Sequence, residues 1–212
     1  MKNMGEKVKK EIMTDKPAVH KIMTAAAPLF AQKGFAAVSV KELAEAAEVN
    51  IALISYYFGG KEKLYAAILE AQFELVDNII VSIRNEERCP IEKIRRFSQK
   101  FVKLHKFYPY NHRLIYGEII NSTNCYESIV KPAILRNHDF LTECIQEGIN
   151  NGQIRSDVKP DCANVLLGSV LHFYFMTNYL ADEFLETKKD KAEYYMTEAI
   201  EMFLRGVLSN PT

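Results

Sequence analysis

The sequence predicts an all-α protein with a three-helix N-terminal part and a larger helical C-terminal part. Apolar residues recur at three- and four-residue steps along most of the 212-residue chain, which is the spacing of one helix face. No segment alternates apolar and polar residues as a half-buried strand does. With only 9 glycines and 7 prolines, the chain is neither disordered nor collagen-like in composition.

Composition and charge exclude several classes of protein. The chain is 48% apolar and 25% charged, so it can bury a full core without a metal or a disulfide. Its formal net charge is zero, and a charge-driven partner must therefore bind a local patch. The four cysteines are far apart and form no CxxC pair, which is not the spacing of a zinc site or a disulfide framework. We expect no metal and no cofactor.

Two segments of the sequence bear on the location of the protein in the cell. Residues 1–16 are polar and Lys-rich, with no apolar stretch typical of a secretory signal. Residues 163–181 carry no charge, which approaches the length of a membrane span. However, they include Asn164, His172 and Asn178, whose insertion into a bilayer is costly. A helix buried on most sides is the favoured interpretation, and we expect a cytoplasmic protein without a membrane partner.

The first three helices are predicted from periodicity and capping residues. Residues 19–30 show one apolar helix face, and Gly34 is a plausible stop. Pro28 lies inside this pattern, where it should kink the helix. Ser39 and Glu42 form a capping box at the start of a second, short helix. Asn50 is a strong N-cap for a third helix, which Gly59 and Gly60 end.

The pattern of the rest of the chain predicts further helices. A long one begins at Lys61, and the charged residues 84–90 should connect it to the next. Helices are then expected over residues 91–107, 111–121, 126–149, from Pro160 through the uncharged stretch, and 191–208. Asn151-Gly152 is compatible with a hairpin turn, but helical patterns on both sides favour a helix C-terminus. The expected domains are residues 1–64 and 65–212.

Two short helices joined by a tight turn are typical of a helix-turn-helix module, although an ordinary bundle contains such pairs too. The residues left outside distinguish the two cases. If Ile54 and Phe58 face inward, then small, apolar and hydroxyl side chains face outward: Ile51, Ala52, Ser55 and Tyr56. Such side chains suit base edges, thymine methyl groups and phosphates in a major groove. Lys61 adds a positive charge at a helix N-terminus, which favours a phosphate.

Charge partition supports the same interpretation. The first 64 residues contain 10 Lys and 7 Asp or Glu, and Lys2, Lys7, Lys9 and Lys10 form a basic arm. A patch of this size predicts modest non-specific affinity for DNA with strong salt sensitivity.

Three runs together carry a resemblance to a known family. They are Ile22…Ala26…Leu29-Phe30-Ala31-Gln32-Lys33-Gly34-Phe35, then Ser39-Val40…Leu43-Ala44…Ala47-Glu48-Val49-Asn50, and then Tyr56-Tyr57-Phe58-Gly59-Gly60-Lys61-Glu62-Lys63-Leu64. Residues 16–69 resemble the N-terminal domain of TetR family transcriptional regulators in composition, order and spacing. The length and helical content of the remainder resemble the regulatory domain of that family, as does the turn Gly148…Gly152-Gln153-Ile154-Arg155.

The resemblance implies a homodimer that reads a palindromic operator in double-stranded DNA and is released by a signal in the C-terminal domain. Residues 50–58 match the reading helix. The implied DNA-binding residues are Ser39, Asn50, Ile51, Ala52, Ser55, Tyr56, Tyr57 and Lys61. Two positions depart from the family pattern. Glu48 replaces a glycine in the turn and must adopt a conformation that is costly for a residue with a Cβ. Ser55 replaces a frequent tyrosine. Both departures bear on the operator sequence.

Aromatic and histidine residues gather in the C-terminal half, where they indicate either a pocket for a small apolar or aromatic ligand or ordinary helix packing. The candidate ligand residues are Phe101, His105, Tyr108, Tyr116, His172, Phe173, Phe175 and Tyr179, and His112 is a further possible donor. The last two helices are apolar on more than one face, and the resemblance places the dimer contact there.

The leading hypothesis is a ligand-responsive repressor. A DNA-binding protein controlled by a protein partner, or an all-α enzyme, remains as the alternative. The sequence contains no GxGxxG, GxxxxGK or GxSxG motif and no Glu-x-x-His pair, so we do not expect an enzyme.

Overall fold

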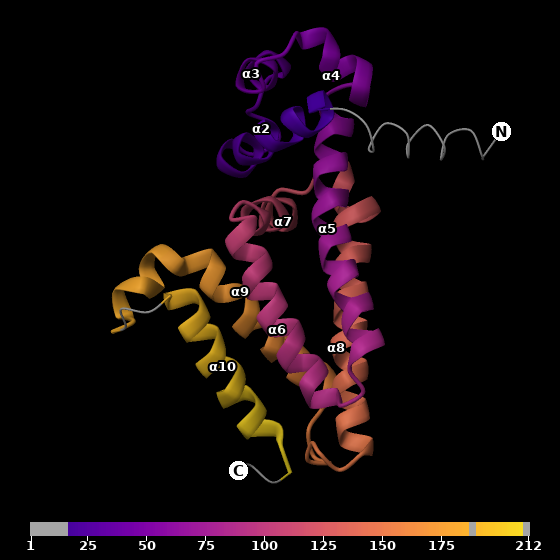
Figure 1. Ribbon diagram of the computed structural model, residues 1–212, viewed down its shortest axis with the longest axis vertical. Helices are drawn as coiled ribbons and strands as arrows, with labels where there is room; N and C mark the ends of the chain where they lie inside the picture. Colours follow the sequence, from indigo (N-terminus) through magenta and orange to yellow (C-terminus); the bar gives the residue numbers. More distant parts are fainter. Residues whose placement is uncertain (1–16, 187–189, 210–212) are drawn as a thin grey trace, which may run out of the picture. The chain divides into compact units, whose positions relative to one another are not determined.

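A computed structural model describes residues 17–186 and 190–209 of the chain (Figure 1). The predicted basic arm lies outside these residues. Apart from one isolated bridge between Ile154 and Leu208, all regular structure described is helical, which confirms the all-α prediction. The elements are α2 (Pro17–Lys33), α3 (Val40–Ala46), α4 (Ile51–Phe58), α5 (Lys61–Glu86), α6 (Pro90–Phe107), α7 (Asn111–Ile120), η1 (Tyr126–Val130), α8 (Lys131–Asn150), α9 (Pro160–Phe184) and α10 (Lys191–Val207).

One predicted boundary was wrong in detail. The long helix α5 continues to Glu86, so the connection to α6 is shorter than the charged stretch suggested. The helix expected over residues 126–149 begins with a π-helical turn, η1, before α8 continues it. α2 runs through Pro28 to Lys33. The other helices begin and end within a few residues of the expected positions.

The described residues form two compact units. The first contains residues 17–72 and 113–129. The second contains residues 73–112, 130–186 and 190–209. The segment 113–129 therefore folds with the N-terminal helices, although it is distant from them in sequence. The predicted boundary after residue 64 stays a prediction.

The core of the first unit consists of the apolar side chains that the periodicity placed inward. Those with little or no exposed surface include Ile22, Phe30, Leu43, Ile54 and Leu64. The predicted caps are confirmed. The Ser39 hydroxyl accepts a hydrogen bond from the Glu42 amide at 3.1 Å, and Gly59 ends α4 with a φ of 76°, which favours glycine.

Segment 113–129 joins this unit through a buried carboxylate. Glu118 is 1% exposed and accepts hydrogen bonds from the Thr123 amide at 3.1 Å and hydroxyl at 3.0 Å. Burial, together with the charge of Glu118 and a hydrogen bond to it, raises the pKa of Tyr65 far above its usual range. Tyr65 in turn packs on Phe30, with ring centroids 4.9 Å apart.

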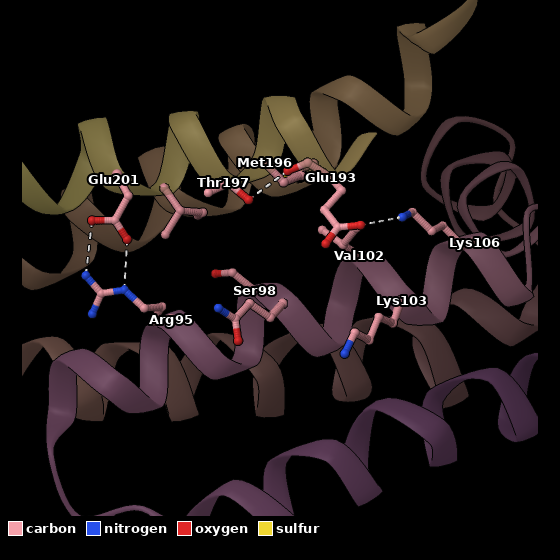
Figure 2. Close-up of a pocket in the computed structure, with 11 residues that line it drawn as sticks. Arg95, Ser98, Val102, Lys103, Lys106, Glu193, Met196, Thr197 and Glu201 are labelled. Carbon is pink, nitrogen blue, oxygen red and sulfur yellow. Dashed lines mark hydrogen bonds and ion pairs between the residues drawn. The ribbon is translucent and has the colours of Figure 1, made fainter. Parts of the chain in front are cut away.

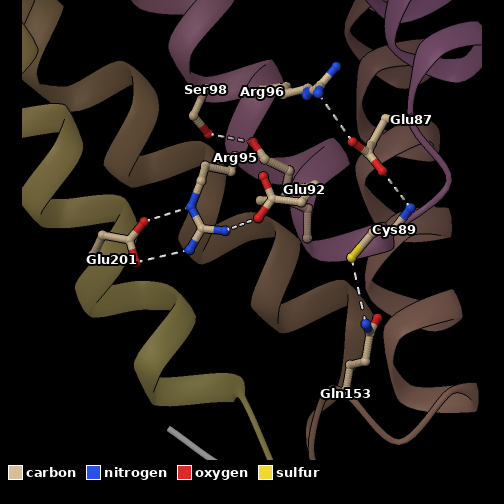
Figure 3. A network of polar contacts seen from close by, with 9 residues as sticks. Glu87, Cys89, Glu92, Arg95, Arg96, Ser98, Gln153 and Glu201 are labelled. Carbon is tan, nitrogen blue, oxygen red and sulfur yellow. Dashed lines mark hydrogen bonds and ion pairs between the residues drawn. The ribbon is translucent and has the colours of Figure 1, made fainter. Parts of the chain in front are cut away.

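The second unit is a helical layer in which α10 packs on α6 and α9, and α8 packs on the other side of the same pair (Figure 1). Gly148 permits a close turn after α8, because a Cβ there would lie 2.7 Å from the Ile154 side chain. The amides of Gln153 and Ile154 both donate to the Gly148 carbonyl at 2.9 Å. Just before α6, the Glu87 carboxylate accepts from the Cys89 amide at 2.8 Å (Figure 3).

Candidate DNA-binding surface and interior cavity

Helix α4 presents the surface that the sequence predicted. The Asn50 side chain accepts from the Ala52 amide at 2.9 Å and so fixes the start of the helix. Ile54 is fully buried and Phe58 is half-buried. The opposite side is open to solvent, with Tyr56 73% and Ile51 49% exposed, and with Ala52 and Ser55 also exposed. The predicted inward and outward faces are therefore confirmed, while the roles of these residues at DNA stay predictions.

Two tyrosines extend this surface at the end of α4. Tyr57 is half-buried, and its ring meets that of Tyr56 edge to face with centroids 5.0 Å apart. This contact restricts the orientation of the exposed Tyr56 ring without covering it.

The turn before α4 holds Glu48 in the left-handed region, with a φ of 48°. The prediction that Glu48 takes a glycine-like conformation is confirmed. Its carboxylate lies 2.9 Å from the Lys21 ammonium, and this hydrogen bond lowers the pKa of Glu48. The contact ties the turn to α2.

Lys61 has an additional role that the sequence did not reveal. Its ammonium donates to the backbone carbonyls of Phe35 at 2.9 Å and Val38 at 2.8 Å, and it lies 4.3 Å from the centroid of the Phe35 ring. An ammonium has three protons, so one remains for a phosphate. The hydroxyl of exposed Ser39 accepts from the Glu42 amide and keeps its own proton for donation. Their phosphate contacts remain predictions.

The structure brings together half of the predicted ligand residues. Phe101, His105, His172 and Phe175 form one aromatic cluster, together with His112. Four others lie elsewhere. Phe173 is 60% and Tyr179 75% exposed on α9, Tyr108 is 44% exposed, and Tyr116 belongs to the first unit. The eight candidates therefore do not form one cluster, because neighbouring positions on a helix point in different directions, and their contacts with a ligand stay predictions.

A cavity of about 360 Å³ opens beside this cluster. We call it the histidine cavity and define it by His105, His112, Tyr174, Phe175, Asn178 and Asp182. Burial lowers the pKa of His105 to about 4 and, with the neighbouring imidazoles, that of His112 to about 2. Both rings are therefore neutral near pH 7. The lining histidines could orient a ligand but would not attract one by charge.

A second groove, of about 310 Å³, lies between α6 and α10 (Figure 2). Ion pairs close both of its ends. The Arg95 guanidinium donates two hydrogen bonds to the Glu201 carboxylate, at 2.8 and 3.1 Å (Figures 2 and 3). At the other end, the Lys106 ammonium lies 3.1 Å from the Glu193 carboxylate. Apolar side chains, including Val102 and Met196, lie between these ends. None of the predicted ligand residues lines this groove.

No group of three or more His, Cys, Asp and Glu side chains among the described residues is arranged to hold a metal ion. Among the helices of residues 17–186 and 190–209, none, including α9 with its uncharged stretch 163–181, has the length and apolar character needed to cross a membrane.

The chain is similar in sequence to known transcriptional regulators. Residues 22–68 match the model for bacterial regulatory proteins of the tetR family. The probable HTH-type transcriptional regulator YttP of Bacillus subtilis is 25% identical over 192 residues, which cover 88% of this chain and 92% of that protein. The HTH-type transcriptional repressor NicS of Pseudomonas putida is 24% identical, covering 88% and 90%.

A solved structure has the same fold. The ketosteroid transcriptional regulator KstR2 of Mycobacterium tuberculosis superposes with a TM-score of 0.78 at 14% identity, covering 93% of this chain and 98% of that chain. The family match includes α3, the turn and α4, whose outer surface is exposed as described above. Residues 22–68 therefore form a DNA-binding domain of the TetR family, and the chain is similar over most of its length to helix-turn-helix transcriptional regulators.

Proposed function

We propose that the protein is a cytoplasmic, dimeric repressor that binds a palindromic operator and is released from it by a small apolar or aromatic ligand. The observation that carries the DNA-binding part is the exposed face of α4. A globular surface helix usually carries long charged side chains there, whereas this one presents Ile51, Ala52, Ser55 and Tyr56. Such a surface gains from contact with base edges and methyl groups in a major groove.

A dimer would supply two such helices. α9 and α10 carry large apolar side chains that the single chain leaves exposed: Val165, Leu166, Phe173, Met176, Tyr179, Leu180, Phe184, Tyr194 and Met202. Many of those on α9 are three, four or seven residues apart, which places them along one side of the helix. Contiguous exposed apolar surface of this kind marks a protein interface, and a two-fold axis would pair it with itself.

The repressor and ligand parts have separate support. The relative NicS is described as a repressor, and the structural neighbour KstR2 as a ketosteroid regulator. The histidine cavity is open and partly aromatic, which favours a small molecule over the alternative of control by a protein partner alone. A completely filled core would have favoured that alternative.

Selection of bound sequences from a random duplex pool tests the DNA-binding part, and the mass of the resulting complex tests the dimer. We expect an inverted repeat bound by two chains, because two-fold symmetric readers match palindromic sites. Enrichment of an asymmetric site bound by one chain would contradict the proposal.

A further inference from the structure

The orientation of His105 in the histidine cavity determines what the ring can offer a ligand. Its Nδ1 lies 2.9 Å from the Phe101 carbonyl oxygen. Because a carbonyl only accepts, Nδ1 must carry the proton of this contact. In the neutral ring, the other nitrogen, Nε2, is then an acceptor. His105 is 6% exposed, and its low pKa of about 4, caused by burial, keeps this tautomer neutral at pH 7.

The walls beside His105 include the flat faces of two rings. The rings of His105 and Phe175 stack with centroids 4.5 Å apart and planes inclined by 25°. The His112 ring lies 5.5 Å from that of Phe175. Planar ligands pack well against such surfaces.

The polar groups around the opening largely satisfy one another. Lys106 lies 2.6 Å from Asp190, and Lys191 donates to the backbone carbonyl of Asp182. The Tyr174 hydroxyl donates to the Asp182 carboxylate at 2.7 Å. The two lysines and two aspartates that line the cavity balance in formal charge. A charged ligand would lose its hydration without gaining a dedicated counter-ion.

From this geometry we infer that the histidine cavity takes a neutral, planar ligand of one or two rings that carries a hydrogen-bond donor, as a phenol does. The ligand hydroxyl donates to Nε2 of His105 while its ring lies against Phe175. The cavity volume of about 360 Å³ is at the small end for ligand sites. The inference rests on the proposed function only for the consequence that such a ligand would act as the effector.

The test uses the full chain in the absence of DNA and compares three compounds of the same ring size by calorimetry. They are 2-naphthol, which has the donor, 2-methoxynaphthalene, which has lost it, and 2-naphthoate, which is charged. We expect 2-naphthol to bind at least about tenfold more tightly than either, because the buried acceptor would otherwise lose its partner. Equal affinity for the methoxy compound, or tighter binding of 2-naphthoate, would overturn the inference.

The variant His105→Phe keeps a ring against Phe175 but removes the acceptor. We expect it to lower the preference for 2-naphthol over 2-methoxynaphthalene from about tenfold to near one. The variant His138→Phe, on a half-exposed part of α8 outside the cavity, should retain the full preference. If His105→Phe does not fold, the comparison of compounds on the unaltered chain still decides.

A final titration separates the two hypotheses. In this titration, 2-naphthol is added to the chain bound to its selected duplex. If 2-naphthol binds with the expected preference but does not release the chain from the duplex, the ligand-release part of the proposed function fails and the cavity chemistry stands. If the preference for 2-naphthol is absent while the chain binds an inverted repeat as a dimer, the cavity chemistry fails and the DNA-binding function stands.

Discussion

Lys61 joins the start of α5 to the loop before α3, because its ammonium donates a hydrogen bond of 2.8 Å to the Val38 carbonyl. A second bond of 2.9 Å goes to the Phe35 carbonyl. The same residue occupies a position that the family resemblance implies for phosphate contact. A structural role and a DNA role can therefore be separated by experiment.

We expect Lys61→Met to lower the free energy of unfolding by about 1 to 2 kcal/mol, since it removes two charge-assisted hydrogen bonds to backbone that is only partly exposed. Urea denaturation measures this. The control Lys63→Met removes an exposed ammonium from the same turn and should leave stability within about 0.5 kcal/mol of the original. An unchanged stability in Lys61→Met would show that the two contacts contribute nothing.

Salt titration of DNA binding examines the other role of Lys61. If the third ammonium proton contacts a phosphate, Lys61→Met should weaken binding to all duplexes alike and reduce the slope of log affinity against log salt by about one. A slope equal to that of the unaltered chain would assign Lys61 to structure alone.

Base reading by α4 predicts that substitutions at Ile51 or Tyr56 change sequence preference. We expect Tyr56→Phe or Ile51→Ala to alter the ranking of operator variants, with single base pairs changing affinity by about 1 to 3 kcal/mol. Competition binding against a set of singly altered operators measures this. An equal loss on every variant would move the residue to a positioning role.

The apolar side of α9 predicts the oligomeric state. Phe173→Glu would place a charge in the proposed dimer contact, where it could not be hydrated, and we expect monomers in sedimentation equilibrium together with weaker operator binding. Phe107→Glu is the matched control, because Phe107 is 80% exposed but ends α6, away from α9 and α10 in the chain. If Phe173→Glu sediments as the unaltered chain does, this contact is not the interface.

The buried histidines predict a loss of stability in weak acid. Burial lowers the pKa of His105 and His172 to about 4, from an ordinary value near 6.5. Between these values the unfolded chain binds protons that the folded chain does not. The stabilisation is therefore complete above pH 6.5 and falls with decreasing pH, by up to about 1.4 kcal/mol per pH unit for each histidine.

Urea denaturation at several pH values between 7 and 5 checks this dependence. The variant His105→Phe should show a shallower slope than the unaltered chain, because one group that titrates on unfolding has gone. Identical slopes would show that His105 takes up its proton equally in both states.

Local signals allowed much of the fold to be predicted from sequence. The caps at Ser39 and Asn50 and the stop at Gly59 depend on residues a few positions away, and each was predicted correctly. Contacts of Lys61 with Phe35 and Val38 could not be foreseen, because they depend on the path of a loop more than 20 residues away. Phe173 was grouped with Phe175 among the clustered aromatic residues, yet positions two residues apart on a helix differ by about 200°, and Phe173 faces outward.

The cluster itself was only partly visible in the sequence. His105, His112 and His172 were each noticed, but the stacking of His105 on Phe175 arises from the packing of two helices that are far apart along the chain. Burial of Glu118 within segment 113–129 left no local signal at all, since a lone glutamate on a helix is usually exposed.

Methylation protection on the selected duplex tests most directly whether the open face of α4 lies in the major groove. Dimethyl sulfate attacks guanine N7, which faces that groove. We predict protection of guanines in two segments whose centres are about 10 base pairs, or a multiple of that, apart, and loss of that protection in Tyr56→Asp. Bound duplex with every guanine N7 still reactive would contradict the account.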